Sequence, residues 1–211
     1  MEFTGSLSAR SAARIDWLKR APNQARGALW AARNPVTCAG SPSIGRRHRF
    51  PLVDNRGGRI EFGRGVRLMG FRFPASFGVG PGGVLRVGDN SGFNQGVDIF
   101  ASTSIEIGSW TSIGNLVSIF DTSFHEVEPG AGVVTKPVVI GDNVMVGPMS
   151  IILPGVTIGD NTVVGAGSLV TSSLPAGVLA AGNPATVKRT LKIEDGWIRL
   201  LGQPEPQPET A

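Results

Sequence analysis

The sequence predicts an all-β fold in which short strands wind into a parallel β-helix. Three observations predict it: aliphatic residues recur every six positions, glycine is abundant, and charged residues are scarce. The chain has 211 residues, of which 30 are Gly, and only 17% are charged, against about 25% in an average globular domain. Few long solvated helices are therefore expected, while a hydrophobic content of 41% excludes a disordered chain.

The six-residue period is clearest in the C-terminal half. Every sixth residue there is a β-branched aliphatic: Ile140, Val146, Ile152, Ile158, Val164 and Val170. A helix has a period near 3.6 and a single strand a period of 2, so flat strands joined by corners are the structure that explains a period of six. Glycine follows the aliphatic where the chain must turn tightly, at Gly141, Gly147, Gly159 and Gly165. Small or β-branched residues four positions after the aliphatic suit a narrow interior: Val144, Ser150, Val156, Thr162 and Ser168.

The same period continues upstream, with interruptions. Two series carry it, separated by a two-residue shift: Val87, Phe93 and Ile99, then Ile107, Ile113 and Ile119. A weaker trace begins at Phe62 and Leu68. Ile119 and Ile140 are 21 positions apart, where whole coils need 18 and the next hexad needs 6, so a loop of about fifteen residues is expected to leave the coil.

Positive charge is concentrated at the N-terminus. Residues 1–72 carry fourteen Lys and Arg against four acids, whereas residues 73–187 carry two against eight and residues 188–211 carry four of each. The net charge of +4 is therefore produced by an N-terminal arm attached to an acidic body. Binding of nucleic acid is not expected, because the positive charge does not extend over the body.

Two short helices are expected in the arm, at about residues 8–20 and 22–33. The second carries Leu29 and Trp30. An apolar stripe flanked by Arg could lie on an anionic membrane or on a partner, although packing on the protein's own body is the simpler interpretation. The expected segments are a basic helical arm and linker at 1–58, a β-helix at 59–187 with a loop at 120–138, and a tail at 188–211.

Cysteine usage and the absence of targeting signals predict a cytoplasmic protein. Cys38 is the single cysteine, which excludes an internal disulfide framework and a zinc site built from several thiolates. No signal-peptide pattern and no run of eighteen apolar residues occurs.

The hexads resemble those of the hexapeptide-repeat family, over about residues 59–190. Members of this family form a left-handed parallel β-helix and are mostly acyltransferases. The resemblance implies a left-handed parallel β-helix of hexapeptide repeats here, with a short helical N-terminal arm and an extruded loop. The handedness comes from the resemblance alone, since the usual crossover between parallel strands is right-handed. The family also implies a homotrimer with active sites between neighbouring chains.

The expected loop contains His125, one of only two histidines in the chain. Catalytic groups often lie on an irregular loop held by a rigid scaffold. The stretch Asp121-Thr-Ser-Phe-His125 resembles the Asp-Thr-Asp-Phe-His motif of the branch that acetylates sugars and related alcohols, in which the histidine is the general base. The resemblance implies that His125 is the base, and that Asp121 and Glu126 lie near the acceptor.

The chemistry of acyl transfer agrees with this role. A hydroxyl that attacks a thioester loses a proton as the bond forms, and an imidazole titrates in the range needed to take it. A carboxylate or a carbonyl should hold the other nitrogen of the imidazole, and the carboxylates of Asp121, Glu126 and Glu128 all remain candidates. Backbone N–H groups near Gly147 are expected to stabilise the oxyanion. A covalent acyl-enzyme is not expected, because Cys38 lies outside the repeat.

Further segments resemble the family's substrate-binding regions. The segment Gly92-Phe-Asn-Gln-Gly96 matches one in which relatives bind the acceptor hydroxyl, which makes Asn94 a candidate, although a corner cap explains Asn94 equally well. The C-terminal hexads and Ala181-Gly-Asn-Pro-Ala185 resemble the end that binds coenzyme A. The resemblance implies cofactor contacts at Met145, Gly147, Ala166 and Ser168, and at Lys188 and Arg189 for the phosphates.

The predicted function is O-acetyl transfer from acetyl-CoA, or another acyl-CoA, to a hydroxyl of a sugar or a related acceptor. N-acyl transfer to an amino sugar or an antibiotic amine is the alternative. A non-enzymatic β-helix binding protein is more remote. A zinc hydratase on the same fold needs three His per metal, which two histidines do not supply, so no metal is expected.

Overall fold

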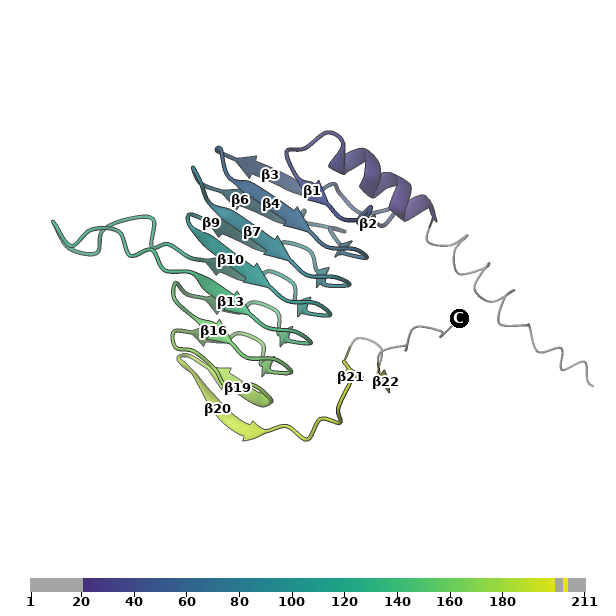
Figure 1. The fold of residues 1–211 in the computed structure, drawn as a ribbon. Coiled ribbons are helices and arrows are strands. Elements are labelled where there is room, and N and C mark those ends of the chain that lie inside the picture. The colour runs from purple at the N-terminus through teal and green to yellow at the C-terminus, as the bar shows by residue number, and fades with distance from the viewer. Residues whose placement is uncertain (1–20, 200–202, 205–211) are drawn as a thin grey trace, which may run out of the picture.

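A computed structural model describes residues 21–199 and 203–204 of the chain (Figure 1). Short parallel strands form three sheets, which are the three faces of a triangular prism. Face A contains β1 (Thr37–Cys38), β4 (Arg59–Phe62), β7 (Val84–Val87), β10 (Ser104–Ile107), β13 (Val138–Ile140) and β16 (Thr157–Ile158). The all-β fold class and the parallel β-helix are thus confirmed.

The other two faces follow the same order along the prism. Face B contains β2 (Ser43–Ile44), β5 (Arg67–Leu68), β8 (Gly92–Phe93), β11 (Ser112–Ile113), β14 (Met145–Val146), β17 (Val163–Val164), β19 (Val178–Gly182) and β20 (Ala185–Thr190). Face C contains β3 (Leu52–Asn55), β6 (Ser76–Val79), β9 (Asp98–Ala101), β12 (Ser118–Phe120), β15 (Ile151–Ile152) and β18 (Leu169–Val170). A separate antiparallel pair joins β21 (Trp197–Ile198) to β22 (Gln203–Pro204).

The strand register confirms the six-residue period. Ile140 pairs with Ile158, and the next two aliphatics of the series pair with Val164 and Val170. The shifted series also pairs as predicted, with Ile107 opposite Val87. All the repeat aliphatics are buried, as are the small or β-branched residues four positions further on. Each coil therefore contributes one layer to a continuous core.

The glycines at the corners are needed for close approach between coils. A Cβ built on Gly147 would lie 2.5 Å from the backbone nitrogen of Ala166 in the following coil. The left-handed backbone conformation occurs two residues later instead, at positions such as Met149, with φ of 60°. The corner thus uses glycine to let two backbones meet, and the residue with positive φ to make the turn.

Aspartate side chains link successive corners between face A and face B. The carboxylate of Asp89 accepts from Arg64 N at 2.7 Å, and that of Asp160 accepts from Asp142 N at 2.8 Å. The hydrogen bond from the Arg64 backbone, supported by the Arg64 guanidinium, holds the pKa of Asp89 below its usual value. These side chains satisfy backbone donors that the turns would otherwise leave unpaired.

The β-helix begins earlier than the sequence predicts. The segment 37–55, assigned to a linker, forms a first coil, because β1, β2 and β3 pair with β4, β5 and β6. Its aliphatic positions are interrupted by long corners, so the period is hidden in the sequence. The predicted end at residue 187 is also misplaced, because it lies inside β20, which pairs antiparallel with β19.

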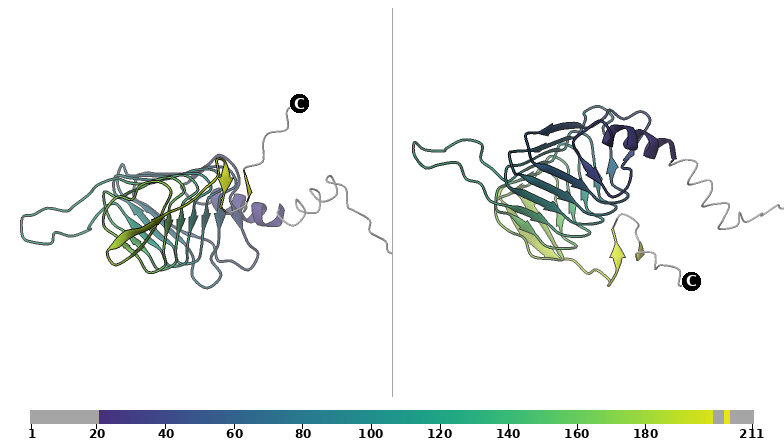
Figure 2. Two further views of the ribbon diagram at one scale, coloured as in Figure 1. Left: turned by 90° about the horizontal axis from the view of Figure 1, so that it is seen from below. Right: turned by 45° about the horizontal axis from the view of Figure 1, so that its top comes forward.

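A helix at residues 21–31 lies at the N-terminal end of the prism (Figure 2). Trp30 is 3% exposed and its Nε1 donates to Pro51 O at 2.9 Å. Its ring packs on Phe62, the first of an interior series of aromatics that continues through Phe77 and Phe93. The second predicted helix is therefore confirmed, with Trp30 packed on the protein's own body. The first, at 8–20, lies outside the described residues.

Among the described residues, no helix combines the length and the apolar character needed to cross a membrane.

Candidate functional site

The predicted loop leaves the prism at the corner between face C and face A (Figure 1). It occupies residues 121–137, between the end of β12 and the start of β13. Its two arms are joined near the base, where Thr122 bridges Thr135 and Ser123 N donates to Val134 O at 2.8 Å. The loop is thus an ordered hairpin that extends away from the coil.

A buried carboxylate holds the base of this loop. Asp121 is 0% exposed, and its two oxygens accept four hydrogen bonds of 2.6–2.8 Å. The donors are Ser102 N, Thr103 N, Thr103 Oγ1 and Ser104 N, in the turn of the preceding coil. Burial removes this side chain from any acceptor, so the predicted acceptor contact of Asp121 is wrong. It anchors the loop instead.

His125 lies near the start of the loop and is exposed to solvent. Its backbone is held by Ser123, whose carbonyl accepts from His125 N at 2.7 Å and whose Oγ donates to His125 O at 2.9 Å. Within the part of the chain that the structure describes, no side chain hydrogen-bonds to its imidazole. The ring is therefore open to an incoming molecule.

The three carboxylates considered as orienting groups do not perform that role within one chain. Asp121 is occupied by the backbone of the preceding coil. Glu126 accepts from Gly130 N at 2.9 Å, which stabilises the outer turn of the hairpin. Glu128 is exposed, and its carbonyl accepts from Ala131 N at 3.1 Å. Glu126 is exposed, and its contact with an acceptor stays a prediction.

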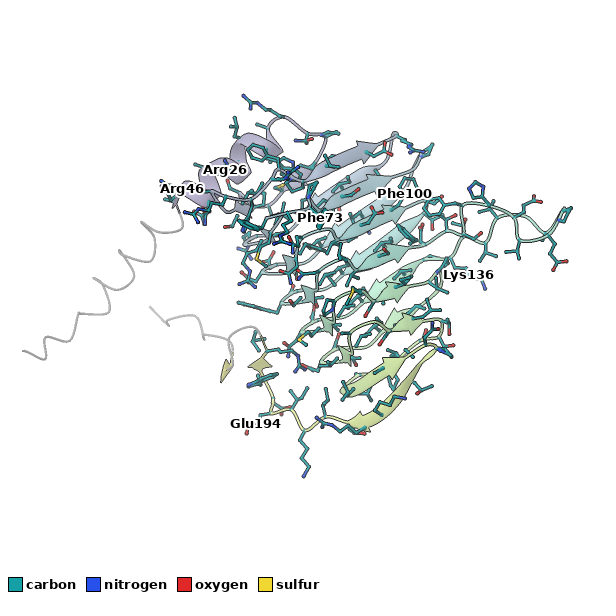
Figure 3. All side chains as sticks on the ribbon, turned by 180° about the vertical axis from the view of Figure 1, so that it is seen from behind. Arg26, Arg46, Phe73, Phe100, Lys136 and Glu194 are labelled. Atoms are coloured by element: carbon teal, nitrogen blue, oxygen red, sulfur yellow. The ribbon has the colours of Figure 1, made fainter. Side chains whose placement is uncertain are left out.

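Sequence reasoning missed an aromatic cluster beside the loop. Phe100 and Phe120 are register partners on β9 and β12, and the Phe124 ring lies 5.4 Å and 5.3 Å from theirs. The Arg56 guanidinium lies 5.4 Å from the Phe100 ring centre, and Arg56 also donates to Asp54, which lowers the pKa of that carboxyl. Figure 3 shows Phe100 on the side of the prism from which the loop with Lys136 extends. The signal was available, because Phe100 and Phe120 each follow a buried Ile of the repeat.

The predicted acceptor and cofactor residues of the coil lie at a different corner. Asn94, Gly147, Ala166 and Ser168 occupy turns between face B and face C, on the opposite edge of face C from the loop. Asn94 N donates to Ile113 O at 3.0 Å, and its side chain is half-buried. A single chain therefore does not bring these residues together with His125.

The structure does not leave Ser168 and the N–H of Gly147 available for the contacts that the sequence predicts. Ser168 is 1% exposed, with Oγ donating to Gly165 O and accepting from Gly182 N, so its side chain belongs to the interior. The N–H of Gly147 donates to Val164 O at 2.8 Å, so it is not available to an oxyanion. The N–H of Ala166 lies at the same corner of the prism, and among the described residues it has no hydrogen-bond partner.

The remaining cofactor candidates lie on face B. Met145 is 39% exposed on β14. Lys188 and Arg189 are exposed on β20, where Lys188 Nζ donates to Thr186 Oγ1 at 2.8 Å. Both cations are exposed, and their contact with phosphate groups stays a prediction.

A separate cavity lies where the C-terminal segment covers the corner between face A and face B. Its volume is about 410 Å³, and its lining includes Asp142, Asp160, Glu194 and Trp197. Asn143 ties this segment down by donating to Trp197 O and accepting from Arg199 N. The loop with His125 leaves from another corner, so this cavity takes no part in the candidate site.

The comparisons with known proteins agree with the fold. A family model described as bacterial transferase hexapeptide (six repeats) matches residues 137–172. The chain is 36% identical over 152 residues to WbbJ of Escherichia coli (strain K12), a protein provisionally assigned to O-acetyl transfer in lipopolysaccharide biosynthesis. That match covers 66% of this chain and 76% of WbbJ.

Two further similarities extend the comparison. The galactoside O-acetyltransferase of Lactococcus lactis is 39% identical over 127 residues, which cover 58% of this chain and 59% of that enzyme. The chain spans about 60% or less of the length of the first curated relatives that it matches. A hexapeptide-repeat acetyltransferase from Vibrio cholerae O1 biovar eltor, solved with acetyl coenzyme A, superposes with a TM-score of 0.55 and 25% identity. That superposition covers 91% of this chain and 94% of the other.

The repeat register, the extruded loop and these similarities lead to one assignment. The chain belongs to the family of hexapeptide-repeat transferases, and its fold is the left-handed parallel β-helix of that family.

Proposed function

We propose that this protein is an acetyl-CoA-dependent O-acetyltransferase that acts on a hydroxyl of a sugar or a related acceptor. The observation that carries the proposal is the placement of His125. It is an exposed histidine, without a side-chain partner among the described residues, on a hairpin that the buried Asp121 anchors to a rigid coil. Similarity to a galactoside O-acetyltransferase and to WbbJ favours an oxygen nucleophile.

The proposed reaction is direct transfer. The acceptor oxygen attacks the thioester carbonyl while His125 takes the hydroxyl proton. The tetrahedral intermediate collapses with cleavage of the carbon–sulfur bond, and the imidazolium returns its proton to the coenzyme A thiolate. The products are an acetyl ester and free coenzyme A, so atoms and charge balance without a metal or an acyl-enzyme.

The positions around the coil support binding of acyl-CoA at the corner between face B and face C. Met145 offers an exposed apolar surface, and the Ala166 N–H is a free donor for an amide carbonyl of the pantetheine arm or for the oxyanion. Lys188 and Arg189 supply positive charge further along face B. The Vibrio cholerae relative was solved with acetyl coenzyme A, which supports the same co-substrate here.

We further propose that a second copy of the chain completes the site. His125 and the group that includes Asn94 and Ala166 lie on opposite edges of face C. A neighbouring prism can bring its coil corner to the projecting hairpin, and a closed ring of such contacts gives a homotrimer.

An acceptor panel tests the reaction. Purified protein is incubated with acetyl-CoA and neutral sugars, amino sugars or alcohols, and products are identified by mass. We expect an acetylated sugar whose acetyl group is released by hydroxylamine, because esters are cleaved and amides are not. A hydroxylamine-stable product formed only on amines would replace O-transfer by N-transfer.

The His125→Asn variant tests the base. We expect kcat to fall by about 10²–10⁴-fold, the usual contribution of a general base, with little change in the melting temperature because the side chain is exposed. Glu128→Gln, a change in the same loop, is the matched control. Wild-type turnover by His125→Asn would remove the proposed role of His125.

A further inference from the structure

The first two coils carry basic and aromatic side chains at the corner between face B and face C. We define the basic tip as Arg46, Arg47, Arg49, Phe50, Phe71 and Arg72. All six side chains are exposed, with Phe50 at 39% and Phe71 at 59%. In Figure 3, Arg46 lies beside Arg26 at the N-terminal end of the prism, away from the loop that carries Lys136. The tip is therefore separate from the loop that carries His125, and it shares its corner of the prism with Asn94, which lies in the next coil.

The basic tip is held in place by the coils beneath it. Arg49 N donates to Gly70 O at 2.8 Å, which joins its two loops, and Arg72 N donates to Gln95 Oε1 at 2.9 Å in the next coil. Arg26 supports the tip from the helix, because its Nη2 donates to His48 O at 2.9 Å and its guanidinium lies 4.6 Å from the Phe50 ring centre. The exposed rings are thus presented by ordered backbone.

The charge of the tip is not neutralised locally. Residues 21–53 and 62–88 contain no Asp or Glu. Among the residues that the structure describes, Arg46, Arg47, Arg49 and Arg72 form no ion pair, whereas Arg56, Arg59, Arg64 and Arg86 all do. The unpaired arginines therefore favour a partner of negative charge.

We propose that the basic tip docks the protein on an anionic lipid bilayer. The tip is made of two outer turns at a corner of the prism, a convex shape that fits a flat surface. Phe50 and Phe71 can enter the headgroup region while the arginines meet lipid phosphates, the combination typical of interfacial binding. Each cation near an anionic surface adds to the attraction, so the four arginines together favour a reversible attachment that depends on salt.

Sedimentation with vesicles tests this proposal on the full chain. The probe is roughly three parts phosphatidylcholine to one part phosphatidylglycerol, with pure phosphatidylcholine as the neutral reference. We expect binding to the mixed vesicles only, weakening with added salt. Arg46→Glu/Arg47→Glu should lower the apparent affinity by roughly tenfold or more. Equal binding to neutral vesicles, or no loss in this double variant, would overturn the proposal.

A matched control separates local from total charge. Arg59→Glu/Lys192→Glu changes the net charge equally, but Arg59 lies on face A and Lys192 in the C-terminal segment. We expect this control to bind the mixed vesicles as the wild type does. A loss equal to that of Arg46→Glu/Arg47→Glu would mean that net charge alone governs binding, and the tip would not be a docking surface.

Insertion of the aromatic rings has its own readout. Because the chain has four native tryptophans, the readout is the difference from the wild type. On mixed vesicles, Phe71→Trp should add a blue-shifted emission that brominated lipids quench, whereas Val127→Trp, on the exposed loop, should add neither. Inorganic phosphate should not displace the protein. Displacement by phosphate, absence of quenching at position 71, or preference for a DNA oligonucleotide over the vesicles would each contradict bilayer docking.

Discussion

The carboxylate of Asp121 connects the loop to the coil through four hydrogen bonds, all of them shielded from water. Asp121→Asn removes the charge and turns an amide NH₂ toward backbone donors. We expect the free energy of unfolding to fall by about 2–3 kcal/mol, and kcat to fall because the hairpin loses its base. Thermal unfolding measures the first effect, with the exposed Asp98→Asn as control. An unchanged melting temperature would contradict the anchoring role.

Asp89 gives a pH-dependent contribution to stability. Its pKa is lowered in the folded state by the hydrogen bond from Arg64 N, so its contribution is fully present above the unfolded value near 3.9 and is lost as the pH falls through the folded value. Asp89→Asn should therefore lower the melting temperature by about 2–4 °C at pH 7. The difference from the wild type should vanish in strong acid. A difference that persists there would point to packing.

At the level of single strands, an exposed ion-pair ladder crosses face A. Arg86 on β7 bonds Glu61 on β4 at 3.0 Å and Glu106 on β10 at 3.1 Å. Such solvent-exposed pairs contribute less than about 1 kcal/mol each. We expect Arg86→Ala to change the urea midpoint only slightly, whereas Leu85→Ala, one residue away but 0% exposed, should cost about 2–5 kcal/mol. Equal effects would contradict this division between face and core.

The aromatic cluster belongs to the loop and two strands together. Phe124 packs on Phe100 and Phe120, so it closes the start of the loop against face C. We expect Phe124→Ser to leave the melting temperature almost unchanged, because Phe124 is 45% exposed. It should, however, speed proteolytic cleavage within 121–137. Limited proteolysis followed by mass determination gives the readout, and an unchanged cleavage rate would show that the hydrogen bonds alone order the loop.

The coils differ in how well the sequence predicts them. Strict hexads such as Ile140 to Val170 specify coils directly, because each aliphatic must enter a narrow interior. The first coil was hidden, since long corners such as 45–51 break the period. Asp121 was misassigned because its motif places it beside His125, whereas burial depends on backbone donors one coil away. Contacts between coils, unlike periods, are not local in the sequence.

For the whole molecule, the distance between His125 and the corner that carries Asn94 predicts how copies of the chain assemble. If neighbouring chains share each site, His125→Ala and Asn94→Ala coexpressed should form mixed trimers in which some sites hold both intact residues. We expect a fraction of wild-type activity from the mixture and almost none from either variant alone. Light scattering should give the mass of three chains. A monomeric mass, or no recovery of activity, would contradict the shared site.

The two ends of the prism have a consequence for solubility. A stack of parallel strands ends in backbone groups that another chain could extend, as in a growing fibre. Here the helix that carries Trp30 lies over one end, and β20 folds back antiparallel on β19 at the other. A parallel strand from another copy would meet β20 in the wrong direction. The same edge of its β20 would also bring the positive charges of Lys188 and Arg189 close to those of the second copy. At the C-terminal end of face B, the antiparallel β20 thus opposes the addition of another copy of the repeat.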